Sequence, residues 1–161
     1  MIFSLLVLLF VTLQRLGELW LSNRNTRALL ARGAHEVAPG HYPLIVIVHV
    51  LWLAALWWLA PGRPIDAFWL ALFIVLQLAR LWVVASLGDR WTTRIIVLPD
   101  AALVTRGPYR WVSHPNYLIV IGEIAALPLA FGLWGVALIF TILNGAVLAI
   151  RIRAENRALR S

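Results

Sequence analysis

The stretch 2–21, which reads Ile-Phe-Ser-Leu-Leu-Val-Leu-Leu-Phe-Val-Thr-Leu-Gln-Arg-Leu-Gly-Glu-Leu-Trp-Leu, decides the fold class. A helix of this length crosses the hydrocarbon core of a bilayer, which is roughly 30 Å thick. The stretch has no basic start and no small-residue cleavage site, so we expect a permanent span rather than a signal peptide. The whole chain of 161 residues is 62% hydrophobic and 13% charged, against roughly a quarter charged in soluble domains. These features predict an all-α integral membrane protein.

Working outward from this stretch, the chain shows further hydrophobic segments separated by polar connectors. We predict a single domain over residues 1–161 with four more spans, at 43–60, 65–87, 117–131 and 133–150. The connector 22–42 is expected to be partly helical around 26–31. In the connector 88–116, two short β-favouring runs, 95–98 and 101–105, flank Pro99 and Asp100 and predict a hairpin at the membrane interface.

The basic residues, all of them Arg, predict the orientation in the membrane. The connectors 22–42 and 88–116 hold three and four of them and the tail from Arg151 holds four, whereas the opposite side holds only Arg63. Because basic loops remain in the cytoplasm, we predict an inner-membrane protein with its N-terminus outside and its C-terminus cytoplasmic. The dispersed positive charge favours membrane lipids over nucleic acid as the partner.

Ionisable residues inside the predicted spans gather in the cytoplasmic half. Arg15, Glu18, His49, Arg80 and Glu123 all fall there, several of them about 10 Å from the membrane surface at 1.5 Å per residue. An ionised group in lipid is costly, so this sorting predicts a polar cavity open to the cytoplasm, in which these five residues contact the substrate. Arg80 and Glu123 are the expected pair. The alternative is that such groups only hold helices together, and a lone His49 fits a helix–helix hydrogen bond.

Metal sites are disfavoured by the same residues. The chain has no Cys, and no second His lies three or four positions from His49. Zinc sites are usually built from Cys and His at short spacings, so we expect no metal.

The loop 106–117 concentrates the residues of a binding site. It contains Gly-Pro and His-Pro steps, which force the backbone out of helix, together with two Arg, two Tyr, a Trp and a His. On the last predicted span, Asn144, Arg151 and Glu155 share one helical face that leads toward this loop. Arg151 and Glu155 are also spaced as an ordinary exposed i,i+4 ion pair, which is the alternative interpretation.

The motifs Gly107-Pro108-Tyr109-Arg110 and His114-Pro115-Asn116-Tyr117, followed by a hydrophobic hairpin and then the segment from Arg151 to Leu159, resemble the C-terminal half of the isoprenylcysteine carboxyl methyltransferase family. Members of that family are membrane enzymes that use S-adenosylmethionine. The resemblance implies a cofactor site formed by Gly107, Tyr109, Arg110, His114, Pro115, Tyr117, Asn144, Arg151, Glu155 and Asn156. The chain departs from the family pattern at Ser113, where Arg is usual, and at Asn156, where a second Glu is usual.

The resemblance implies methyl transfer to a lipidic acceptor, either a carboxylate or a long-chain polyketide phenol or pyrone. Glu123 is the candidate base for a phenol, and Arg80 or Arg15 the candidate anchor for a carboxylate or phenolate. Arg151 and Glu155 join Glu123 as catalytic candidates because they would contact the cofactor. Two alternatives remain open: an NADPH-dependent membrane reductase of the sterol reductase type, and a non-catalytic membrane scaffold.

Overall fold

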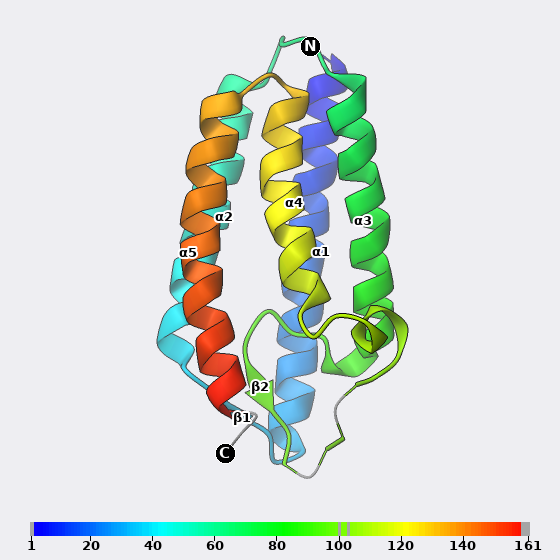
Figure 1. Cartoon of the computed structure of the whole chain (residues 1–161), viewed down its shortest axis with the longest axis vertical. Coiled ribbons are helices and arrows are strands. Elements are labelled where there is room, and N and C mark those ends of the chain that lie inside the picture. Colours follow the sequence, from blue (N-terminus) through cyan, green and yellow to red (C-terminus); the bar gives the residue numbers. More distant parts are fainter. Residues whose placement is uncertain (1, 100, 103, 159–161) are drawn as a thin grey trace.

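The computed structural model describes residues 2–99, 101–102 and 104–158. In the described residues, five α-helices run side by side in a bundle, and the first turn of the first helix lies at the opposite end from the last turn of the last helix (Figure 1). The helices are α1 (Ile2–Ala31), α2 (Tyr42–Leu59), α3 (Ala67–Leu87), α4 (Pro115–Ala130) and α5 (Trp134–Ala158). The short elements are β1 (His35–Glu36), β2 (Ile96–Val97) and the 3-10 turns η1 (Pro39–His41), η2 (Gly88–Arg90) and η3 (Gly107–Arg110).

Four of these helices are long and apolar enough to cross a membrane, namely α1, α2, α3 and α5, while α4 is a shorter apolar helix of 16 residues. Many large apolar side chains on their outer faces are exposed, including Phe10, Leu78 and Leu138. Exposed apolar surface on this scale is stable where lipid covers it. The prediction of an all-α, multi-pass membrane protein is confirmed.

The first helix is longer than the sequence predicted. It continues without a break from Ile2 to Ala31, so the helix expected around 26–31 is confirmed as the end of α1 and residues 22–25 are helix as well. No Gly or Pro interrupts residues 18–32, and Gly33 at φ +89° follows the helix end. At 30 residues, α1 is about 45 Å long and extends beyond a hydrocarbon core of roughly 30 Å.

The final helix runs to Ala158, past the predicted end of the membrane span at Ile150, because the polar residues after Ile150 are good helix formers without a breaker. This continuation agrees with the helical face predicted through Arg151 and Glu155. The predicted hairpin was wrong: β2 pairs antiparallel with β1, with His35 opposite Val97, and the described residues of 101–105 form no strand. Asp100 and Leu103 lie outside the described residues.

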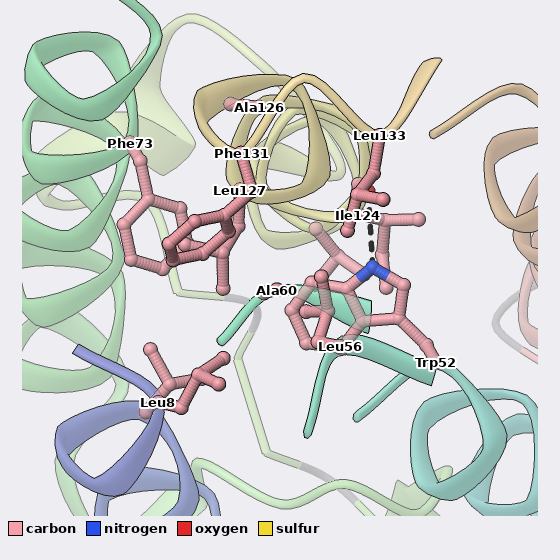
Figure 2. Close-up of a cluster of buried hydrophobic side chains, with 12 residues drawn as sticks. Leu8, Trp52, Leu56, Ala60, Phe73, Ile124, Ala126, Leu127, Phe131 and Leu133 are labelled. Carbon is pink, nitrogen blue, oxygen red and sulfur yellow. Dashed lines mark hydrogen bonds between the residues drawn. The ribbon is translucent and has the colours of Figure 1, made fainter. Parts of the chain in front are cut away.

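The apolar core fills the end of the bundle that is remote from the strands. Leu8, Leu56, Phe73 and Leu127 from four different helices pack together there, and each is almost completely buried (Figure 2). The indole Nε1 of Trp52 donates to the carbonyl of Ile124 at 3.1 Å, so the large ring leaves no unpaired donor. The ionisable residues of the spans, such as Arg15, Arg80 and Glu123, lie in the other half of the bundle.

Candidate functional site

A closed ring of four charged side chains lies inside the bundle. Arg15 donates to Glu18 at 3.0 Å and to Glu123 at 2.7 Å. Arg80 from α3 donates to Glu123 at 3.1 Å and, through two nitrogens, to Glu18. Each arginine therefore bonds both glutamates, and each glutamate accepts from both arginines. The predicted Arg80–Glu123 pair is confirmed, as half of a larger network.

Glu123 is the most deeply buried member of this ring. Its side chain is completely buried, and both arginines bond the same oxygen, Oε2. The other oxygen, Oε1, is buried without a hydrogen-bond partner among the described residues. Both cationic neighbours therefore face a single oxygen of this carboxylate.

The ring forms part of the wall of a cavity of about 200 Å³ within the bundle, which we call the bundle cavity. Its walls are mostly apolar and come from all five helices, with Leu16, Val50 and Leu148 as examples. Its polar wall residues include Arg15, Glu18, Arg80 and His49, whereas Glu123 is not among them in the described chain.

One ring nitrogen of His49 is hydrogen-bonded within its own helix, α2. Its Nδ1 lies 2.8 Å from the carbonyl oxygen of Ile45, one turn earlier in α2. This nitrogen therefore bonds within α2 and does not make the helix–helix hydrogen bond that the sequence left open. No group of three or more His, Cys, Asp or Glu side chains suited to a metal ion occurs among the described residues.

The loop before α4 brings together residues from two distant motifs. The Tyr117 hydroxyl donates to Glu155 and accepts from Nε of Arg151 at 3.0 Å. The His114 ring stacks on Tyr117 with centroids 5.3 Å apart, and its Nε2 lies 3.2 Å from Oδ1 of Asn156. Arg151 and Glu155 thus interact through the Tyr117 hydroxyl, and the direct i,i+4 ion pair is not formed.

These residues line a second and larger cavity of about 520 Å³, which we call the interfacial cavity. Six of the ten predicted cofactor residues are in its wall: Tyr109, His114, Tyr117, Arg151, Glu155 and Asn156. Burial, together with the negative charge of Glu155, raises the pKa of the Tyr109 phenol to about 12, so this group stays a neutral hydroxyl at physiological pH.

The other four predicted cofactor residues lie outside the cavity wall. Arg110 is exposed and places its guanidinium 5.6 Å from the centre of the Trp111 ring. Pro115 is buried in the first turn of α4, and Asn144 is completely buried with neither side-chain polar atom bonded among the described residues. Gly107 lies in the turn η3, next to Ser86 of α3.

Gly107 allows the loop to approach α3 closely. It has φ +61°, and a Cβ atom there would lie 2.1 Å from Oγ of Ser86. We expect Gly107→Ala to lower the free energy of unfolding by about 1–3 kcal/mol more than Gly132→Ala does. Gly132 is the matched control because it has φ +67° with nothing within 4 Å of an added Cβ. Thermal unfolding of both variants measures the difference, and equal losses would contradict the close contact.

The sequence did not identify the connector that closes the interfacial cavity. Much of its described wall comes from residues 90–92, 94–98, 101–102 and 104–105, most of whose side chains are apolar and carry no binding motif. Asn25 anchors this connector by donating to the carbonyls of Gly88 and Trp91, and Arg94 anchors it through Glu36. The polar residues of 22–31 would have indicated these contacts if the segment had been predicted to be the C-terminal end of α1.

The two cavities share a boundary. Trp91, Thr92, Asn116, Tyr117 and Arg151 line both of them. A helical, multi-pass membrane protein with two adjoining internal cavities, of which the interfacial one has the more polar wall, is the class that this structure defines.

Comparison with known proteins agrees with this class. Residues 69–161 match the model of the isoprenylcysteine carboxyl methyltransferase (ICMT) family. The chain is 36% identical over 160 residues to the uncharacterized protein YpbQ of Bacillus subtilis, covering 96% of this chain and 95% of that protein. It is 28% identical over 151 residues to an uncharacterized protein of Haemophilus influenzae, covering 90% and 88%. No solved structure matches the chain.

The chain therefore belongs to the isoprenylcysteine carboxyl methyltransferase family, a family of membrane methyltransferases. The resemblance seen in the sequence is confirmed.

Proposed function

We propose that this protein is an S-adenosylmethionine-dependent O-methyltransferase that acts on a lipidic acceptor at the cytoplasmic side of the membrane. The observation that carries the proposal is the boundary shared by the interfacial and bundle cavities. Transfer of a methyl group from a sulfonium requires donor and acceptor in line within a few ångströms, so positioning supplies much of the catalysis. Two adjoining cavities, of which the interfacial one has the more polar wall, support that arrangement.

The residues of the interfacial cavity fit the cofactor. Its volume of about 520 Å³ suits a ligand of this size. When bound, the cofactor supplies an electrophilic methyl group on a cationic sulfur. Glu155 has the charge to hold its amino group, and Arg151 the charge to hold its carboxylate. Oδ1 of Asn116 is a buried acceptor without a partner among the described residues, and it lies on the boundary where a ligand donor would satisfy it.

The bundle cavity fits an acceptor that carries an apolar chain. Its wall is mostly apolar, and large apolar side chains are exposed on the outer surface of the bundle around it. A lipidic acceptor could therefore place its reactive oxygen at the Tyr117 boundary while its chain extends along the helices. The interfacial cavity is lined by the connector that carries β2, so it lies at the end of the bundle where the arginine-rich connectors run (Figure 1), which supports an inner-membrane orientation with this end in the cytoplasm.

The proposal is tested by ligand-induced stabilisation of the detergent-purified protein. S-adenosylhomocysteine at about 100 times its Kd should stabilise the fold by roughly 2.7 kcal/mol, measured as a rise in Tm. NADP at the same concentration is the comparison, because the reductase alternative requires it. A shift with NADP alone would replace the methyltransferase by a reductase, and no shift with either ligand would leave a non-catalytic scaffold.

A further inference from the structure

The bundle cavity contains charged residues whose charges are already compensated. Arg15 and Arg80 each bond two carboxylates, so the ring of two arginines and two glutamates has no net charge. The Nε atom of Arg15 has no partner among the described residues, but it is buried rather than exposed to the cavity. Neither arginine is therefore left to hold an anionic acceptor. This argues against a carboxylate, which would enter an apolar cavity without a counter-charge.

Arg151, the cationic residue at the boundary between the two cavities, is also hydrogen-bonded. Arg151 donates to the Tyr117 hydroxyl and lies over its ring, with 5.7 Å from the guanidinium carbon to the ring centre. Through that hydroxyl it is linked to Glu155, and in the proposed function it serves the cofactor. An acceptor in the bundle cavity is thus best bound when its reactive group is neutral.

His49 offers the proton acceptor that a neutral hydroxyl needs. A carbonyl oxygen only accepts, so Nδ1, at 2.8 Å from the Ile45 oxygen, carries the hydrogen. In the neutral ring this tautomer leaves a lone pair on Nε2. Nε2 makes no hydrogen bond to any described residue, and His49 lines the cavity. Glu123, the base candidate from sequence, is completely buried, is bonded by two arginines and does not line the cavity.

We infer that Nε2 of His49 accepts the proton of a neutral, hydroxyl-bearing acceptor of the phenol or enol class. This inference rests on the proposed function. In the reaction, the acceptor oxygen forms a bond to the methyl carbon and the carbon–sulfur bond breaks, with its electron pair left on sulfur. The O–H bond breaks as its proton passes to Nε2, and the imidazolium then releases that proton to water. Phenols, with pKa near 10, are within reach of imidazole, whereas aliphatic alcohols are far weaker acids.

Two variants separate the ring nitrogens. His49→Asn places its amide near Nδ1 and preserves the bond to Ile45, but it removes Nε2. His49→Gln places its amide near Nε2 and can hydrogen-bond there, but it cannot take up a proton. The titratable or charged groups that line the cavity with His49 are Arg15, Glu18, Tyr42, Arg80, Tyr117 and Arg151, and both variants leave them unchanged.

The first readout is binding of matched probes to the purified protein in detergent without a methyl donor. Calorimetry with para-dodecylphenol and dodecanoate should give at least tenfold tighter binding of the phenol to the wild type. His49→Asn should lose most of that preference at unchanged thermal stability. Equal or tighter binding of dodecanoate by the wild type, or an unaltered preference in His49→Asn, would overturn the inference.

The second readout is the pH profile of methyl transfer to para-dodecylphenol. A lost general base should lower kcat at pH 7 by about 100-fold or more in both variants. Their rates should then rise about tenfold per pH unit toward the ionisation of the phenol itself, while the wild type changes less. A wild-type profile in His49→Asn would show that the imidazole only bonds its own helix. Stabilisation by S-adenosylhomocysteine, measured in parallel, reports on the proposed function independently, because neither variant alters the interfacial cavity.

Discussion

Replacing Glu123 by Gln is expected to lower the free energy of unfolding by about 3–5 kcal/mol, because it leaves two buried arginines facing a neutral amide. Glu123 is completely buried and accepts from both Arg15 and Arg80, so no water can replace its charge. Unfolding in mixed micelles, followed by circular dichroism, measures the loss.

The control for this variant is the exposed ion pair between Arg32 and Asp89. Its side chains are 51% and 70% accessible, so Arg32→Ala should cost at most about 1 kcal/mol. If Glu123→Gln unfolds like the wild type but loses turnover of a phenol selectively at neutral pH, Glu123 acts as a base and not as a part of the ring.

Replacing Glu155 by Gln is expected to weaken the binding of S-adenosylhomocysteine by about 10- to 100-fold. A hydrogen bond to a charged group contributes about 1.5–3 kcal/mol, and the amide removes the negative charge that would hold the amino group of the ligand. The substitution preserves the shape of the side chain and its ability to accept from Tyr117. Calorimetric titration of the detergent-purified variant measures the affinity.

Arg153→Gln is the matched control, since Arg153 is exposed on the same helix and is not among the described residues that line either cavity. It should bind the ligand like the wild type. Equal affinities for the wild type and Glu155→Gln would remove Glu155 from the site, whereas equal losses in both variants would indicate a general electrostatic effect of the helix.

The sequence predicted the helices well because hydrophobic length alone identifies a segment that crosses lipid. It predicted their ends less well, since Ser22 and Asn25 look like connector residues until their partners Thr93 and Trp91 are known. The same limitation explains the wrong hairpin. Ile96 and Val97 were read correctly as β-favouring, but the partner strand comes from the far connector, and short runs carry no signal for non-local pairing.

The candidate site was predictable only in part. Matching depth in the membrane was enough to pair Arg80 with Glu123, because depth follows from the rise per residue. Whether Arg15 and Glu18 would join them depends on how α1 is rotated, which the packing of the bundle determines. The packing of the bundle also determines that Glu123 of α4 does not line the bundle cavity. The His-Pro motif identified the loop, but not the connector that covers it.

The ring of charges also constrains how the protein is made. Arg15 precedes Glu123 by 108 residues, and at ribosomal rates of roughly 5–20 residues per second this interval is about 5–20 seconds. During it, α1 enters the bilayer without two of its final partners. Arg15 and Glu18, three residues apart, can bond each other from the start. The nascent first helix therefore carries its own counter-ion through membrane insertion, and the remaining helices complete the neutralisation as they arrive.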